Sequence, residues 1–191
     1  MNKHILSTIS SALMIMLLLV SSGCDSSIAN PQEGDLGVSA IVDGYAFLPK
    51  VFSATRSSLS TVTSVKIESS GSLTFLDNQK KGTLTINLTN VKGTGEYAFG
   101  GGIAGFNSAT YVYDTVRYNP FSQRDEVVDK SYSTSSGSPN VGKVNVTSFS
   151  DTEIAGTFDF TTVNIETIAN GVKDTTYKAV VGGRFRAIFG I

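Results

Sequence analysis

The sequence contains one histidine and one cysteine, His4 and Cys24, and both lie within its first 24 residues. A Ser/His/Asp triad, a Cys/His dyad and a zinc site built on histidine or cysteine each require side chains that the rest of the chain lacks. We therefore expect no catalytic residue of these classes, no metal ligand and no cofactor.

The chain also lacks a basic run. Its 15 Lys and Arg residues are balanced by 16 Asp and Glu residues, which gives a formal net charge of −1, and Lys80-Lys81 is the densest basic pair. Proteins that bind nucleic acid neutralise phosphates with clustered Lys and Arg. We therefore expect no nucleic-acid partner.

Long apolar runs are absent after the N-terminus. Lys3 and His4 precede an apolar segment, Ile5 to Val20, and small residues follow it. This order is typical of a secretory signal peptide, and the run is shorter than the roughly 20 apolar residues of a spanning helix. The pattern predicts a signal peptide over residues 1–23, with a retained single-span anchor as the alternative.

Cys24 follows the segment Val20-Ser21-Ser22-Gly23, which resembles the lipobox of bacterial lipoproteins. Gly23 and Cys24 match its two most constrained positions, whereas Ser21 departs from the usual Leu, Val or Ile. The resemblance implies cleavage before Cys24, a diacylglyceryl group on its sulfur, and palmitate-type acylation. Two or more acyl chains anchor a protein stably to a membrane. Ordinary secretion with a free thiol is the alternative.

Residues 24–37 are predicted to form the lipidated cysteine and a flexible tether, because Asp25 to Gly37 is rich in Ser, Asn, Pro, Gly and acidic residues. Residues 38–191 are predicted to form a single domain. The expected partner is the membrane, to which the lipid anchor would attach the protein. We expect the protein in the bacterial cell envelope, with the outer membrane or cell surface favoured over the inner membrane.

Alternation of apolar and polar residues with period two dominates the chain after Val38, and no segment there has a sustained helical period. The polar faces indicate antiparallel pairing, and so long a sheet is expected to curl or split. The pattern predicts an all-β fold, an antiparallel β-sandwich or flattened barrel of about ten strands. We expect the core to include Leu84, Ile86, Leu88, Val144, Val146, Phe158 and Phe160.

Residue pairs that contain glycine are expected to separate these runs. Asp43-Gly44 between two apolar segments predicts a type I′ hairpin, and Gly182-Gly183 is interpreted as a further break between strands. Gly100 to Gly105 reads GGGIAG, which fits the spacing of a dinucleotide-binding loop. The sequence that follows is β-like and not helical, so we expect a glycine-rich loop or bulge.

Two strand-and-turn phrases resemble a family of uncharacterised Bacteroidota lipoproteins known as a domain of unknown function. The opening phrase matches at Ala40, Val42, Gly44 and Phe47, and the late phrase matches at Ile154, Gly156, Thr157, Phe158 and Phe160, before a terminal Gly183 and Phe185. The resemblance covers most of residues 38–191. It implies an all-β envelope lipoprotein and no particular activity.

Seven aromatic residues lie between Tyr97 and Phe121. Alternating aromatics are most often core residues, but Phe106 follows a glycine run, and Asn119-Pro120 predicts a turn between Tyr118 and Phe121. Loop aromatics can stack on sugars or contact a protein partner. Phe106, Tyr118 and Phe121 are therefore the candidate binding residues, with a glycan or an envelope protein as partner.

The favoured function is a noncatalytic binding or interaction module. The alternative is a carboxylate-dependent glycan-processing enzyme or an inhibitor-like protein. For that alternative, the neighbouring acids Asp125-Glu126 and Asp151/Glu153 are the candidates.

Lipidation at Cys24 can be tested directly. Changing Cys24→Ala should move the protein from the detergent phase to the aqueous phase in a phase-partitioning assay, because the acyl chains would be lost. A variant that still partitions into detergent would show that the N-terminal apolar segment is an uncleaved anchor.

Overall fold

The computed structural model describes residues 35–74, 80–100, 107–134, 141–168 and 171–190, all within one compact unit, Pro31–Ile191. These residues form an all-β fold, as the sequence predicts. Its ten strands are β1 (Gly37–Val42), β2 (Tyr45–Leu59), β3 (Val62–Leu73), β4 (Lys80–Leu88), β5 (Gly95–Ala98), β6 (Ser108–Asn119), β7 (Arg124–Ser133), β8 (Gly142–Phe149), β9 (Glu153–Thr167) and β10 (Lys173–Ile188).

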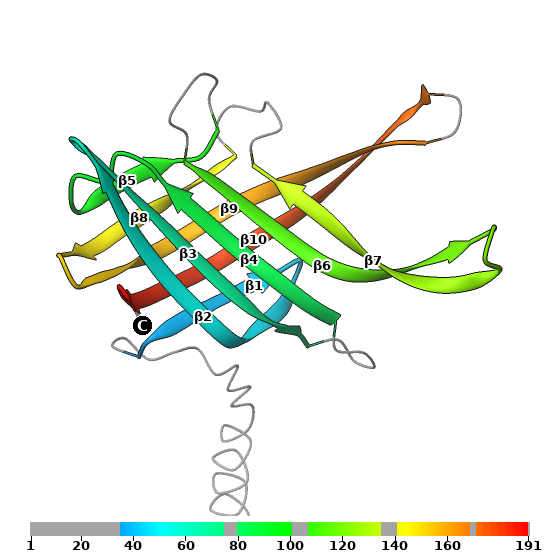
Figure 1. Cartoon of the computed structure of the whole chain (residues 1–191), viewed down its shortest axis with the longest axis horizontal. Coiled ribbons are helices and arrows are strands. Elements are labelled where there is room, and N and C mark those ends of the chain that lie inside the picture. The colour runs from blue at the N-terminus through cyan, green and yellow to red at the C-terminus, as the bar shows by residue number, and fades with distance from the viewer. Residues whose placement is uncertain (1–34, 75–79, 101–106, 135–140, 169–170, 191) are drawn as a thin grey trace, which may run out of the picture. The chain divides into compact units, whose positions relative to one another are not determined.

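The ten strands pair antiparallel in one sheet of order β10-β1-β2-β3-β4-β6-β7-β9-β8-β5, and β9 also pairs with β10. This pairing of β9 with β10 closes a ring of eight strands, from β10 through β1 and β7 back to β9 (Figure 1). The link between β7 and β9 is a single pair, Ser133 with Val163. The closed ring favours the flattened-barrel alternative over two separate sheets.

Alternation along β4 and β9 places one face of each strand in the core. Leu84, Ile86 and Leu88 are buried while the residues between them are partly exposed, and Phe158 and Phe160 are buried between exposed neighbours. All seven predicted core residues are buried. The period-two pattern therefore identified the core-facing side correctly.

The Asp43-Gly44 turn is confirmed as type I′. Val42 pairs with Tyr45, and the two residues between them have positive φ values of 49° and 84°.

Gly182-Gly183 does not separate two strands, so that interpretation is wrong. Both glycines lie inside β10, at a bulge where the register with β9 shifts between Val180 and Gly183. The amide of Gly182 donates to Asp159 Oδ1 at 2.7 Å, and its φ is +60°. The bulge adds one residue to β10. The core-facing residues are therefore even-numbered before the bulge, as at Val180, and odd-numbered after it, as at Phe185.

Two phenylalanines of the β9–β10 hairpin lie across glycines of the opposite strand. Phe158 pairs with Gly183, and Phe185 pairs with Gly156. A Cβ on Gly183 would lie 2.2 Å from the Phe158 ring, and one on Gly156 would lie 2.9 Å from the Phe185 ring. The two rings stack with centroids 6.2 Å apart. We call these four residues the phenylalanine–glycine pairs.

Gly183→Ala should destabilise the fold by about 1–3 kcal/mol through overpacking, and Phe158→Ala by about 3–5 kcal/mol. Because both changes act on the same contact, the double variant should lose less than the sum in urea denaturation. Leu84→Ala is the control, since β4 pairs with neither β9 nor β10. Strict additivity of Gly183→Ala with Phe158→Ala would contradict the close packing described here.

Candidate functional site

The connection between β6 and β7 is a four-residue loop, Pro120 to Gln123, closed by the pair Asn119–Arg124. Asn119 Oδ1 accepts hydrogen bonds from the backbone amides of Phe121, at 2.9 Å, and Ser122, at 3.3 Å. An Asn side chain that bonds the backbone two residues ahead stabilises a turn. The predicted turn at Asn119-Pro120 is therefore confirmed.

A second set of contacts braces the same loop. Asn119 Nδ2 donates to Glu126 Oε1 at 2.8 Å, and Ser122 Oγ donates to the same oxygen at 2.9 Å. These two hydrogen bonds favour the carboxylate and lower the pKa of Glu126. These hydrogen bonds all lie within the β6–β7 hairpin, so the hairpin itself holds the conformation of the loop.

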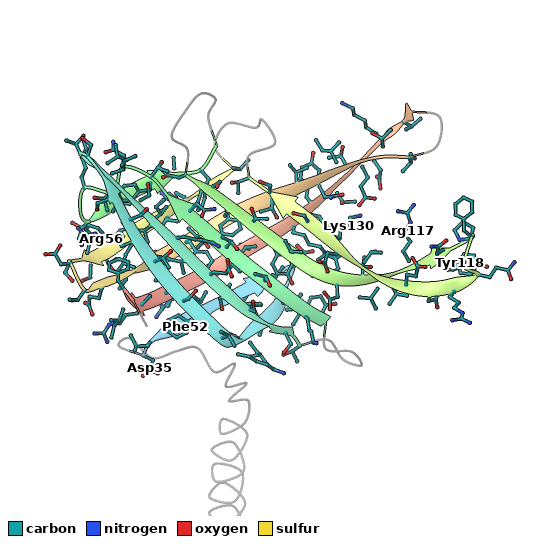
Figure 2. All side chains as sticks on the ribbon, viewed as in Figure 1. Asp35, Phe52, Arg56, Arg117, Tyr118 and Lys130 are labelled. Carbon is teal, nitrogen blue, oxygen red and sulfur yellow. The ribbon has the colours of Figure 1, made fainter. Side chains whose placement is uncertain are left out.

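Tyr118 and Phe121 are presented on this braced hairpin, which extends away from the closed ring (Figures 1 and 2). Phe121 is 97% exposed and Tyr118 is 59% exposed. Val116 and Val127 form an exposed cross-strand pair two residues from Tyr118, so the three share one face of the hairpin. Sequence reasoning missed the two valines, because an exposed strand pair has the same alternation as a buried one.

The other predicted site residues are placed differently. Cys24 and Phe106 lie outside the described residues. Phe99 and Tyr111 are buried, and Tyr97 and Tyr113 pack against the core. For these four aromatics the core interpretation is confirmed. Beyond the glycine run, the chain enters β6 and no helix, as expected for a loop between strands.

Tyrosines and lysines from three strands meet on the core-facing side near the Asp43-Gly44 turn. The rings of Tyr113 and Tyr132 stack with centroids 5.8 Å apart, and Tyr111 stacks on Tyr113 at 5.9 Å. Lys178 Nζ lies 5.6 Å from the Tyr113 ring centre and pairs with Asp43. No local sequence pattern indicates this cluster, because its members come from distant segments.

Burial is the main cause that raises the pKa of Tyr113 to about 12, and burial also raises the pKa of Tyr111. Both phenols therefore stay protonated at neutral pH. Tyr111 is fully buried, and its hydroxyl lies beside Gly82, where a Cβ would come within 2.8 Å. The arrangement is that of a packed aromatic cluster held by cation–π contacts and not of an activated nucleophile.

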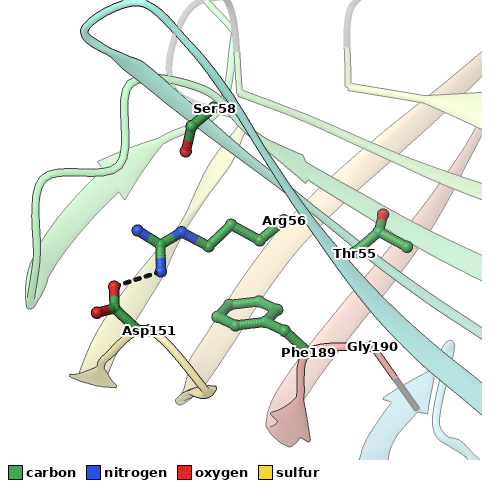
Figure 3. Close-up of a pocket in the computed structure, with 6 residues that line it drawn as sticks. All are labelled: Thr55, Arg56, Ser58, Asp151, Phe189 and Gly190. Atoms are coloured by element: carbon green, nitrogen blue, oxygen red, sulfur yellow. Dashed lines mark hydrogen bonds and ion pairs between the residues drawn. The ribbon is translucent and has the colours of Figure 1, made fainter.

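A pocket of about 390 Å³ lies at one end of the core-facing side (Figure 3). It is lined by Thr55, Arg56, Ser58, Asp151, Phe189 and Gly190. Arg56 Nη1 is 2.8 Å from Asp151 Oδ1, and the guanidinium lies 5.4 Å from the Phe149 ring centre. We call this the Arg56 pocket. Sequence reasoning missed it because Arg56 and Asp151 are far apart in the chain.

The four candidate acids do not form a facing pair. Asp125 and Glu126 are consecutive on β7, so their side chains point to opposite faces. Asp151 is paired with Arg56, while Glu153 is paired with Arg186 at 3.1 Å. Each member of the second candidate pair therefore has its own cationic partner.

Within the described ranges, no three His, Cys, Asp or Glu side chains gather closely enough to hold a metal ion. The same residues contain no helix with the length and apolar character needed to cross a membrane.

Comparison with known proteins gives one family. Residues 55–183, about two thirds of the chain, match the family described as Domain of unknown function (DUF6252). The matched span includes the late phrase at residues 154–160 and begins after the opening phrase at residues 40–47. No curated protein and no solved structure gives a significant match. The chain therefore belongs to the DUF6252 family of domains of unknown function.

Proposed function

We propose that this protein is a lipid-anchored lipoprotein of the bacterial cell envelope, of the Bacteroidota type, whose folded domain is a noncatalytic binding module. The partner is an envelope protein or a glycan, and the β6–β7 hairpin tip contacts it. The observation that carries the binding role is the nearly complete exposure of Phe121 on a braced loop.

The anchor is supported by the sequence around Cys24 and by the start of the folded part. β1 begins at Gly37, the last residue of the expected tether. Between Cys24 and β1 there are thus about a dozen residues rich in Ser, Asn, Pro and Gly. A tether of this composition would let the domain reach partners away from the membrane surface.

The binding role is supported by the physics of an exposed aromatic ring. Phe121 buries almost none of its surface in the fold, and Tyr118 with the valine pair enlarges the apolar area. Aromatic residues contribute strongly to interfaces. Because Asn119 and Glu126 already fix the loop, little conformational entropy would be lost when a partner binds.

The carboxylate-dependent alternative is not proposed, because the candidate acids are separately paired or point apart. A pair of carboxylates flanking a glycosidic bond would need to face one cleft about 5–9.5 Å apart.

Photo-crosslinking tests the binding role in the native envelope. A photoreactive phenylalanine analogue at position 121 should give a discrete adduct, protein or glycosidase-sensitive glycan. The matched control is the same analogue at Val51, which is 68% exposed on β2 and outside the hairpin. Absence of an adduct at position 121, or equal adducts at both positions, would contradict the proposal.

Phe121→Ser separates binding from folding. Because the ring makes almost no contact with the fold, the free energy of unfolding should change by no more than about 0.5 kcal/mol in a urea melt. The adducts formed from a neighbouring position, such as Tyr118 carrying the analogue, should at the same time be lost. A large drop in stability would mean that the ring is structural and that the site is wrong.

A further inference from the structure

We infer that the Arg56 pocket binds one ring of a neutral saccharide, a second binding function at a site separate from the hairpin tip. Arg56 and Tyr118 lie at opposite ends of the view in Figure 2. The inference does not rest on the proposed role of Phe121, and the two can fail independently.

Three segments build the pocket: the outer half of β2, the β8–β9 turn, and Phe189 and Gly190 after β10. Arg56 lies two residues after the buried Ala54, so its side chain projects from the same, core-facing side of β2. Asp151 lies in the β8–β9 turn. There Ser150 Oγ accepts hydrogen bonds from the backbone amides of Thr152, at 3.2 Å, and Glu153, at 3.1 Å. The pocket volume of about 390 Å³ is within the range of small-molecule sites.

The guanidinium of Arg56 is held on two sides. It lies over the Phe149 ring, and Phe149 packs edge-on against Phe189 with centroids 6.3 Å apart. Its Nη1 also lies 3.4 Å from the Ser150 carbonyl oxygen. The Arg56 side chain is 26% exposed, whereas Asp151 is 94% exposed. A fixed cation thus meets an accessible carboxylate at the mouth of the pocket.

The hydrogen-bonding capacity that remains matches hydroxyl groups. A guanidinium has five N–H donors and a carboxylate has two acceptor oxygens. Among the described residues, the ion pair uses Nη1 and Oδ1, which leaves donors on Arg56 and the second oxygen of Asp151. Neighbouring hydroxyls of a sugar can accept hydrogen bonds from the Arg56 donors and donate a hydrogen bond to this oxygen of Asp151. Ser58 adds a hydroxyl, and Phe189 offers a ring for the apolar face of the sugar.

The same geometry disfavours a charged ligand. The Arg56–Asp151 pair is neutral as a unit, so it attracts neither sign strongly. A carboxylate or phosphate bound to Arg56 would lie beside Asp151 or displace it, and the resulting repulsion would weaken binding. The chemistry therefore selects a neutral, polyhydroxylated ring.

A glycan array probes the inference with the full-length protein, purified in a detergent without a sugar headgroup. The array carries neutral mono- to hexasaccharides of glucose, galactose, mannose and N-acetylglucosamine, with anionic glycans beside them. We expect binding to a neutral glycan. Arg56→Lys, which loses the planar fork, and Asp151→Asn, which loses the anionic acceptor, should each weaken it at least about tenfold.

Two controls make the result specific. Arg186→Lys alters a similar arginine–carboxylate pair outside the pocket and should leave glycan binding unchanged. Phe121→Ser shows whether the bound sugar lies at the hairpin tip or in the pocket. Melting curves of all variants show whether they fold, and Asp151 is exposed enough for its variant to do so.

Each remaining outcome overturns the inference. Binding that Phe121→Ser abolishes and Arg56→Lys leaves intact would place the sugar at the hairpin tip, which would contradict the pocket and support the proposed function. Binding of anionic glycans alone, or of no glycan, would also overturn it. In those cases the crosslinking at position 121 remains a separate test of the proposed function.

Discussion

The fold depends on the phenylalanine–glycine pairs that join β9 to β10. Each ring lies where the opposite residue has no side chain, so the two strands approach closely while large apolar surfaces enter the core. The paired strands connect to β1 on one side, and to β7 and β8 on the other. Without this close contact, the ring of strands would be open between β9 and β10.

Closure explains where the surface features lie. β7 pairs with β9 at a single residue pair, and side chains of β9 still reach Ser131 and Lys130 just beyond it. From there the β6–β7 hairpin has no further strand paired with it. Its outer half therefore has no third strand or core to cover its apolar side chains, and its loop is braced locally by Asn119 and Glu126. A rigid scaffold with a self-supported exposed loop is a common arrangement for recognition. The Arg56 pocket arises instead where the end of β2 meets the β8–β9 turn.

Sequence reasoning succeeded where the signal is local. Alternation identified the buried faces of β4 and β9, and Asp43-Gly44 identified its own turn. It failed at Gly182-Gly183, because a bulge depends on a partner: the Asp159 side chain that accepts the Gly182 amide lies on β9. It identified the Asn119-Pro120 turn, beside which Tyr118 and Phe121 are exposed, while the role of these two residues in binding stays a prediction. It could not find the Arg56 pocket, since an arginine and an aspartate almost 100 residues apart leave no local pattern.

Hydrogen–deuterium exchange followed by peptide mass spectrometry tests the central claim, that the β9–β10 pairing holds the closed sheet together. Amides in residues 154–160 and 183–187 should exchange most slowly and only with global unfolding, whereas those in residues 116–127 should exchange through local opening. Equal exchange rates in the two regions, or faster exchange in residues 154–160, would contradict the account.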